Sequence, residues 1–426
     1  MLNSSEYSSH PPRDETSAPE TPSHNESFPS PPLVRYLLGE GISMTGTWMQ
    51  AMAQSWVMAS LTTSAKMIGL VNFVGGIPMI ALSMTGGLFA DKYDKRLILQ
   101  ICQVVQILFS LTLGYLVATH QIQIWHVILA AGLLGVSSAF EMPAASALVP
   151  ELAGKKHVAK AIALDRSVFH GTRLIGPALA GYLVGHYGAA TAFYINAVSF
   201  LALIIALFTL PARPHGSKEQ EEKRQHDMKA GFRHIWHDRP SLAMILLLTT
   251  NTIFVFPVMI VLLPLYAKNV LVLDSQHLGW LMFCSGIGSL SGALMILKVK
   301  KSWRPTVLTL AVTLICMALF SLSRADVFIW AGLSLTTLAL GVSSLIGLSN
   351  TVIQERAPDE IRGRVSAVAG LSFFGLLPFA GMIMATLADW IGIRESLFYA
   401  ACSYASIGLL LLSWTGKSLA PKALDT

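Results

Sequence analysis

Residues 87–96 read Gly-Leu-Phe-Ala-Asp-Lys-Tyr-Asp-Lys-Arg, a short charged stretch between two long apolar runs. Apolar runs of this length on both sides of a charged turn are typical of helices that cross a membrane, and cationic residues flank such helices on the cytoplasmic side. We therefore interpret the stretch as a cytoplasmic loop between two membrane spans. Cations occur at such places in multispanning proteins of many kinds, so the loop alone leaves the function open.

The composition excludes a water-soluble domain. Hydrophobic residues make up 53% of the 426 residues and charged residues 13%, and the mean hydropathy is +0.57, whereas soluble domains carry about 25% charged residues. A helical span needs about 20 apolar residues. A membrane β-barrel would alternate polar and apolar residues in segments of about ten, but runs such as Phe200 to Leu210 are continuously apolar. The sequence predicts an all-α polytopic membrane protein.

The predicted spans number twelve and form two pseudo-symmetric halves of six helices. They fall near residues 33–60, 66–89, 97–119, 123–144, 161–187, 190–211, 241–267, 274–297, 305–323, 327–350, 363–388 and 393–414. The first half covers 33–211, a charged cytoplasmic linker covers 212–240, and the second half covers 241–414. Residues 1–32, rich in Ser, Pro and Glu, are expected to be a disordered cytoplasmic tail, and residues 415–426 a cytoplasmic C-terminal tail.

The distribution of Lys and Arg predicts the orientation. About 25 of the basic residues fall in the tails, the linker and the loops on its side, which places both termini in the cytoplasm of a cell whose inner (plasma) membrane holds the chain. A weak internal repeat supports the two halves: Pro177 and Pro378, both in a small-residue context, are 201 positions apart. Parallel halves of this kind are typical of transporters with alternating access.

The loop also resembles a known family. The spacing of Gly87, Asp91, Lys92, Lys95 and Arg96 resembles the loop between the second and third helices of the major facilitator superfamily. The resemblance implies that Asp91 latches this loop against the start of span eleven when the site faces outward, with Arg362 and Arg364 as its partners. Asp94 stands where the family usually has Gly, and Lys298 to Arg304 in the second half lacks an Asp. We expect a one-sided latch.

Span five carries a second motif. Arg173, Gly176, Pro177 and Gly181 resemble the Gly-Pro signature of the superfamily's drug and proton antiporters. Pro177 removes a backbone hydrogen bond and the glycines permit close helix approach, which favours a pivot, although packing alone also explains small residues in membrane helices. An Arg this far into a span is a functional-site candidate. The alternative is a structural ion pair with Glu40 or Glu141.

Intramembrane carboxylates and amides supply the other candidates. Glu40 in span one and Glu141 near the inner end of span four are candidates for proton coupling, and Glu141 has a loop contact as its alternative. Six polar or aromatic residues are candidates for lining a cargo cavity, with helix-to-helix hydrogen bonding or interface anchoring as the alternative: Trp48, Gln50, Gln54, Asn72, His170 and Asn251.

Five stretches together narrow the resemblance to the enterobactin-exporter type of major facilitator. They are Gly46 to Gln50, Asp91 to Arg96, Phe140 to Leu152, Arg173 to Gly181 and Pro358 to Arg364. This type implies proton-driven export of a siderophore or other small organic molecule. Ala145 stands where that family often has Arg, so one partner of Asp91 is missing and the gating network is expected to be rewired.

The leading hypothesis is therefore a secondary-active exporter working by proton antiport. An importer of a siderophore or a lipid-like solute and a non-transporting membrane scaffold are the alternatives. The sequence has no Walker-type nucleotide motif and no cluster with metal-ligand or nucleophile spacing, so we expect no enzyme, no cofactor and no metal. The expected partners are a small-molecule substrate, protons and the lipid bilayer. We expect no nucleic acid and a monomeric protein.

Overall fold

The computed structural model describes residues 28–154, 156–210, 228–358 and 361–415, which form helices joined by short turns, with no strand among them. Six long helices make up the first half: α1 (Pro31–Leu61), α2 (Ala65–Lys92), α3 (Lys95–Ala118), α4 (Ile124–Ala153), α5 (Val158–Tyr187) and α6 (Ala189–Phe208). The expected tails, apart from residues 28–32 and Thr415, lie outside the described residues, as do residues 211–227 of the expected linker.

The second half has more numerous but shorter elements. They are α7 (Met228–His237), α8 (Arg239–Phe254), η2 (Val258–Leu262), α9 (Leu263–Leu265), η3 (Tyr266–Val270), α10 (Ser275–Ile296), η4 (Lys301–Trp303), α11 (Arg304–Arg324), α12 (Phe328–Arg356), α13 (Arg362–Phe374), α14 (Leu377–Ile391) and α15 (Ile393–Thr415). α8 to η3 form one continuous span, Arg239–Val270, and α13 with α14 forms another, Arg362–Ile391.

Among the described residues, ten segments are long and apolar enough to cross a membrane. The two remaining long helices, α1 with 31 residues and α5 with 30, are too polar to count among them. Counting these two gives twelve, which is consistent with the predicted number. The two polar helices are those that carry Glu40 and Arg173, so their polarity marks where the candidate site lies.

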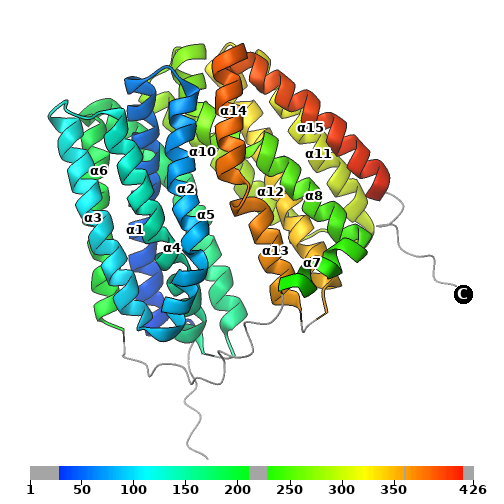
Figure 1. Ribbon diagram of the computed structural model, residues 1–426, viewed down its shortest axis with the longest axis horizontal. Helices are drawn as coiled ribbons and strands as arrows, with labels where there is room; N and C mark the ends of the chain where they lie inside the picture. Colours follow the sequence, from blue (N-terminus) through cyan, green and yellow to red (C-terminus); the bar gives the residue numbers. More distant parts are fainter. Residues whose placement is uncertain (1–27, 155, 211–227, 359–360, 416–426) are drawn as a thin grey trace, which may run out of the picture.

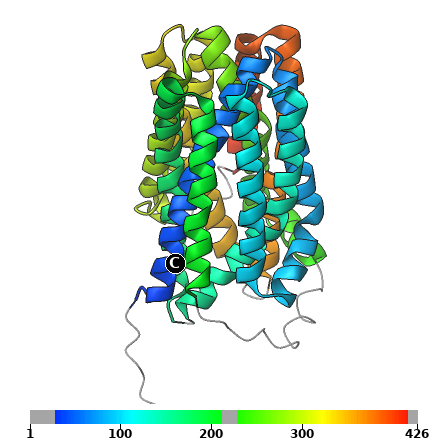
Figure 2. The ribbon, with the colours of Figure 1, turned by 90° about the vertical axis from the view of Figure 1, so that its left-hand side faces the viewer.

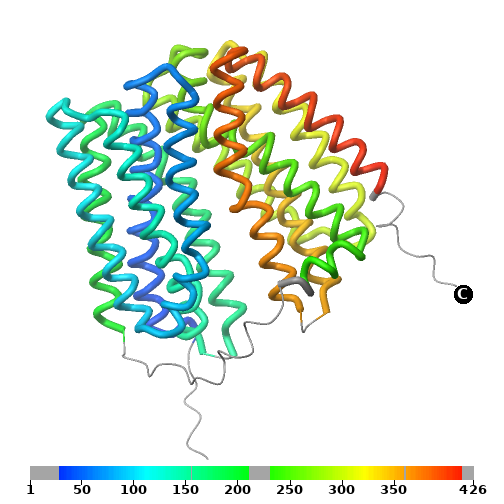
Figure 3. The backbone as a smooth tube through the Cα atoms, in the orientation of Figure 1, coloured from blue at the N-terminus to red at the C-terminus, as the bar shows by residue number. Residues whose placement is uncertain are grey.

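The helices form two bundles that lie side by side in Figure 1. Figure 2 is turned by 90°, so that the first bundle lies in front of the second. The tube in Figure 3 shows the first half and the second half of the chain as separate groups of helices. We call the end of the molecule where α6 ends and α7 begins the linker side, and the opposite end the far side. In Figure 1 the bundles come together on the far side and diverge toward the linker side.

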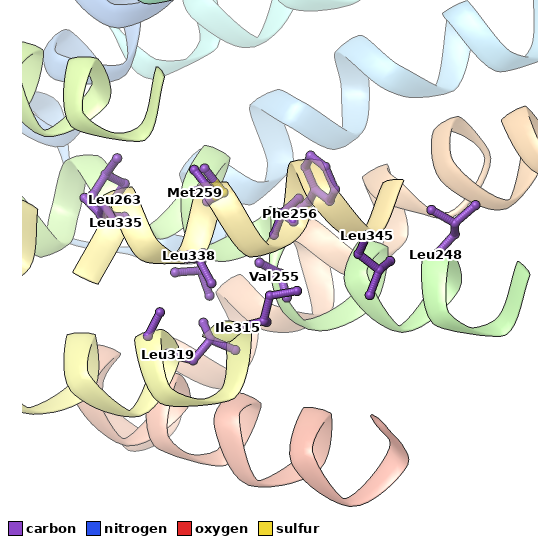
Figure 4. Packing of buried hydrophobic residues seen from close by; sticks show 14 of the residues in the cluster. Leu248, Val255, Phe256, Met259, Leu263, Ile315, Leu319, Leu335, Leu338 and Leu345 are labelled. Carbon is purple, nitrogen blue, oxygen red and sulfur yellow. The ribbon is translucent and has the colours of Figure 1, made fainter. Parts of the chain in front are cut away.

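One apolar cluster centres on the second half and extends to first-half residues such as Met52 and Phe193. Leu335, Leu338 and Leu345 of α12 pack with Ile315 and Leu319 of α11, and Figure 4 shows this layer beside residues of the α8 to α9 span. In the first half, α1, α3, α4 and α6 bury a second cluster at the linker side that includes Leu33, Leu99, Leu148 and Leu207. A third cluster joins Ile68 of α2 to Ala385 of α14, so apolar packing also crosses between the halves.

Three elements differ from the sequence-based prediction, and one of them is α12, which ends at Arg356 rather than at residue 350. α4 continues past residue 144 to Ala153 through Pro143 and Pro150, because Ala144, Leu148 and Leu152 follow a helical spacing that buries one face. Residues 228–237, expected to belong to the solvated linker, form α7, which rests on α13: a Cβ on Gly231 would lie 3.0 Å from the Arg364 backbone.

Candidate functional site

The first seam between the halves joins α5 to α10. Small residues let the two helices touch: the backbone of Gly181 meets that of Gly279, and a Cβ on Gly279 would lie 2.7 Å from the Pro177 carbonyl oxygen. Leu174 meets Gly286 further toward the linker side. Of the two glycines of the predicted antiporter-like motif, Gly181 therefore lies at this seam, whereas Gly176 packs against Trp48 of α1.

The second seam joins α2 to α14. Gly69 packs on Ala385, Gly76 packs on Pro378, and the rings of Phe73 and Phe379 meet edge to face at 5.4 Å. At the far end of this seam, the Asp389 carboxylate accepts hydrogen bonds from the Ser64 hydroxyl at 2.5 Å and the Ala65 backbone N–H at 2.6 Å. Asp389 thus caps the N-terminus of α2 from the other half.

Both seams stop partway toward the linker side. On α5, a Cβ on Gly171 would have nothing within 4 Å, and Leu290 and Leu294 of α10 are exposed. On α2, a Cβ on Gly87 would also have nothing within 4 Å, and the Met84 side chain is 75% exposed. The interface is therefore closed on the far side and open on the linker side.

A pocket of about 90 Å³ lies between the halves where the α2 to α14 seam ends. It is lined by residues of α2, the η2 segment, α13 and α14, and Asn72, Gly76, Ile260, Phe374 and Pro378 are among them. Asn72, a predicted cavity residue, is the polar side chain of this lining, and its amide donates to the Ile68 carbonyl at 3.0 Å.

The charged loop that opened the sequence analysis binds within its own half. Lys95 pairs with Glu151 of α4 at 2.8 Å, and Arg96 donates to the Leu210 carbonyl at 2.8 Å. Asp94, which departs from the family pattern, is the N-cap of α3 and accepts from the Arg96 backbone N–H at 2.9 Å. Asp91 is exposed, and Lys92 lies over the Tyr93 ring at 5.5 Å.

The expected partners of Asp91 lie at the start of α13. The Arg362 side chain is exposed and donates to the Gln354 carbonyl at 3.2 Å. Arg364 is partly buried beside α7. With the linker side open, these cations and the loop belong to different bundles at the end where the bundles diverge (Figure 1).

Parallel helices α1 and α5 bring two groups of functional residues together. Nearer the linker side, Glu40 of α1 lies within interaction distance of Asp165 on α5 and of Tyr36, one turn earlier on its own helix. The Oε2 oxygen of Glu40 is buried and has no hydrogen-bond partner among the described residues. An ionised carboxylate is costly in such a place, so this acidic pair suits a group that carries a proton.

Glu141 has a different environment. Its two carboxylate oxygens accept hydrogen bonds from the side-chain amides of Gln103 at 2.7 Å and Gln106 at 2.6 Å, both on α3. The Ser43 hydroxyl of α1 donates to the side-chain carbonyl oxygen of Gln103 at 3.2 Å. Glu141 therefore ties α3, α4 and α1 together, and its needs as an acceptor are met.

The second group on α1 and α5 surrounds Arg173. The guanidinium lies over the Trp48 ring, 5.4 Å from its centroid, and Phe169 meets the same ring at 5.8 Å. The alternative ion pair of Arg173 with Glu40 or Glu141 does not occur among the described residues. Trp48 and Arg173 are each eight residues further along their helices than Glu40 and Asp165, about 12 Å at a helical rise of about 1.5 Å.

The remaining candidates are scattered. Gln50 is buried in the first half, where its side-chain oxygen accepts from Ser110 and, at 2.8 Å, from Asn196. His170 is partly buried beside Phe169, and Gln54 is partly buried on α1. Asn251 is fully buried in α8, and neither its oxygen nor its nitrogen has a partner among the described residues.

Sequence reasoning missed two residues of the site. Asp165 is an acid within the predicted span 161–187, the same signal that identified Glu40, but it was not among the predicted site residues. Asp389 lies near a helix end on the far side, where charged residues are common in membrane proteins and indicate no site. Its role depends on α2, which is more than 300 residues away in the sequence.

Comparisons with known proteins agree with this geometry. Residues 36–420 match the family described as transmembrane secretion effector. The chain is 27% identical over 355 residues to the staphyloferrin A transporter of Staphylococcus aureus (strain NCTC 8325 / PS 47), covering 82% of this chain and 87% of that protein. It is 23% identical to the multidrug efflux pump Tap of Mycolicibacterium fortuitum, covering 89% and 94%.

Solved structures share the fold. A bacterial homologue of the human lysosomal transporter Spinster, in an inward-facing and unoccupied conformation, matches with a TM-score of 0.71 at 13% identity over 92% of this chain and 99% of that one. The D-xylose-proton symporter matches with a TM-score of 0.69 at 14% identity over 93% and 98%. The two-bundle arrangement is thus that of known membrane transporters.

Proposed function

Because the chain belongs to the transmembrane secretion effector family of the major facilitator superfamily, we propose that this transporter is a secondary-active exporter of a small organic molecule, driven by proton antiport. The similarity to the staphyloferrin A transporter and to the efflux pump Tap supports a siderophore or a drug-like compound as cargo. The chain works as a monomer in the plasma membrane, with residues 33–211 and 241–414 as its two moving halves.

The unequal distribution of Lys and Arg supports the linker side as the cytoplasmic side, with both termini there. The closed far-side seams and the exposed residues on the linker side then correspond to an inward-facing state. In this state cargo enters from the cytoplasm. Export requires the seams of α5 with α10 and α2 with α14 to open while the linker side closes.

The observation that carries the proposal is the buried, unpartnered Oε2 oxygen of Glu40 beside Asp165. Two carboxyl groups this close accommodate one shared proton more easily than two negative charges. Closure of the linker side over the pair would change its access to water and therefore its proton occupancy. Glu40 with Asp165 is therefore the coupling pair, and Glu141, whose oxygens are already satisfied, acts mainly in holding the first half together.

The loop supplies the latch of the opposite, outward-facing state. When the bundles close on the linker side, Asp91 meets Arg362 or Arg364 at the start of α13. The ion pair of Lys95 with Glu151 and the bond from Arg96 to the Leu210 carbonyl hold the loop on its own half, so that the loop moves with that half as a unit.

Transport assays in inverted membrane vesicles test this function. Compounds that cells release only when they make the protein, compared under iron limitation, are purified and added to vesicles whose interior is acidic. We expect accumulation that collapses when the proton gradient is removed, and loss of this dependence in Glu40→Gln. Glu141→Gln should lower the amount of folded protein more than the coupling. Accumulation without a gradient, or movement in the opposite direction, would favour uncoupled transport or the importer.

A further inference from the structure

The guanidinium of Arg173 is a charge without a counter-charge. It lies halfway along α5, is partly buried, and makes no ion pair or hydrogen bond with any residue in the part of the chain that the structure describes. The guanidinium lies over the Trp48 ring. A cation over an aromatic ring is held only weakly, whereas a charge deep in a membrane domain is costly and normally finds a partner.

A second unsatisfied donor lies beside it. The indole N–H of Trp48 is buried and donates to no described group. Buried donors without an acceptor are rare because each one loses its hydrogen bonds to water. Phe169 and His170 complete the surroundings, at ring distances of 5.8 Å from Trp48 and 5.6 Å from each other. The group therefore offers positive charge, hydrogen-bond donors and aromatic surface, but no acid.

The group also lies at a place that a cargo can reach. Leu174, the next residue along α5, contacts Gly286 of α10, whereas a Cβ on Gly171 would have nothing within 4 Å. Arg173 thus lies on α5 between a residue of the seam, Leu174, and the open position at Gly171. Asp165, the acid of α5, is eight residues earlier, about 12 Å away along the helix.

We propose that Arg173 binds a carboxylate of the cargo, so that this exporter carries organic acids. The guanidinium provides a planar fork that matches a carboxylate, and Trp48 and Phe169 provide a surface for an apolar or aromatic part of the same molecule. The proposal rests on the proposed export function because it takes the opening between the halves as the cargo path. It separates the cargo site at Arg173 from the proton site at Glu40 and Asp165.

Binding of matched probe pairs tests the charge requirement. Three carboxylates, benzoate, 2-naphthoate and succinate, are compared with their amides, benzamide, 2-naphthamide and succinamide, by titration of the purified protein at pH 7, following intrinsic tryptophan fluorescence and thermal unfolding. We expect at least one carboxylate to bind about tenfold or more tightly than its amide, the size expected for one charge-assisted hydrogen bond. Equal titrations for every pair, including no response to either member, overturn the proposal.

Variants assign the preference to Arg173. Arg173→Gln should remove the preference for carboxylates, and Arg173→Lys, which keeps the charge, should retain part of that preference. The lysine variant therefore guards against a loss caused by misfolding. Arg324→Gln is the matched control, because Arg324 also lies over an aromatic ring, at 5.5 Å from the Phe398 centroid, but is exposed on α11. A carboxylate preference that survives in folded Arg173→Gln, or disappears in Arg324→Gln, contradicts the assignment.

The same measurements separate this inference from the proposed function. If carboxylates bind at Arg173 but no probe moves against a proton gradient in vesicles, the anion site stands and proton antiport fails. If vesicles show proton-driven export of neutral or cationic compounds only, and binding shows no carboxylate preference, antiport stands and the anion site fails.

Discussion

Asp389 of α14 accepts a hydrogen bond from Ser64 at 2.5 Å, and through it the second half of the chain caps the first turn of α2 in the first half. Its carboxylate also accepts from the backbone N–H groups of Ala65 and Lys66. These are the donors that the start of a helix leaves unsatisfied, and the helix dipole favours a negative charge there. The bonds exist only while the far side is closed, so Asp389 is a latch of the observed state.

Removing this latch should open the far side more often. An N-cap contributes about 1–2 kcal/mol, so Asp389→Ala should raise the far-side-open population about fivefold to thirtyfold. The measurement is the labelling rate of Met384→Cys, a position 5% exposed in the far-side cluster, by a membrane-impermeant thiol reagent after replacement of the native cysteines. Asp389→Asn, which keeps an acceptor oxygen, should fall between. An unchanged rate in Asp389→Ala would show that the seam closes without the latch.

The fold was predictable because its signals are local. Runs of apolar residues between charged turns predicted the spans, and most boundaries agree within about three residues. α4 and α12 were exceptions: α4 runs to Ala153 instead of residue 144 and α12 to Arg356 instead of residue 350, because the burial of residues such as Leu148 and Val352 depends on neighbouring helices. α7 was missed because a ten-residue amphipathic helix gains its stability from packing on α13, which a linker's composition does not reveal.

The candidate site was predictable only in part. Glu40, Trp48 and Arg173 stood out because polar or charged residues within spans are unusual. Their grouping was not predictable, since the match of Glu40 with Asp165 and of Trp48 with Arg173 depends on the register between α1 and α5. The latch on the far side was missed for the same reason: it joins residues that only the closed seam brings together.

Adding a methyl group at the α5 to α10 seam should oppose the closed far side. In Gly279→Ala the new Cβ would lie 2.7 Å from the Pro177 carbonyl oxygen and 2.8 Å from the Gly181 Cα, both backbone atoms that have little room to move. Overpacking costs about 1–3 kcal/mol, so we expect a transport rate at least about tenfold lower and faster labelling at Met384→Cys.

Gly171→Ala is the matched control for this change. It lies at the seam's open end on α5 and its Cβ would meet nothing within 4 Å, while any gain in helix propensity of up to about 1 kcal/mol is common to both substitutions. Transport by Gly171→Ala should stay within about twofold of the wild type. Equal losses at Gly279 and Gly171 would mean that helix flexibility, rather than seam contact, sets the rate.

Charge reversal tests the proposed linker-side latch. Asp91→Arg places like charges opposite Arg362 and Arg364 in the outward-facing state, and we expect transport to fall at least about tenfold while membrane insertion is normal. Adding Arg364→Asp should restore part of the rate. Lys298→Asp makes the same change of charge at an exposed linker-side position of the second half, and it should not restore the rate. If both second changes restore transport equally, net charge rather than a specific pair explains the effect.

Asp238 should make the second half sensitive to acid. Its carboxylate caps α8 through the Ser241 N–H at 3.1 Å and binds Arg356 at 2.5 Å. Burial alone would raise the pKa of Asp238, but the hydrogen bonds from Arg356 and Ser241 outweigh it and hold the pKa below its ordinary value. Its stabilisation is therefore fully present above the unfolded-state pKa of about 3.9 and is lost as the pH falls through the lower folded-state value.

At pH 7, Asp238→Asn should lower the free energy of unfolding by about 1 kcal/mol and Asp238→Ala by about 2 kcal/mol, since the second also removes the cap. The loss of unfolding free energy in each variant should become smaller below about pH 3.9, where the wild-type carboxylate also becomes protonated. Denaturant titration in detergent at pH 7 and at the lowest tolerated pH measures this. Asp326→Asn is the control, because its pair with Arg394 leaves Asp326 74% exposed and should contribute less than about 1 kcal/mol. A cost for Asp238→Asn that matches this control, or that persists at low pH, would contradict the assigned role.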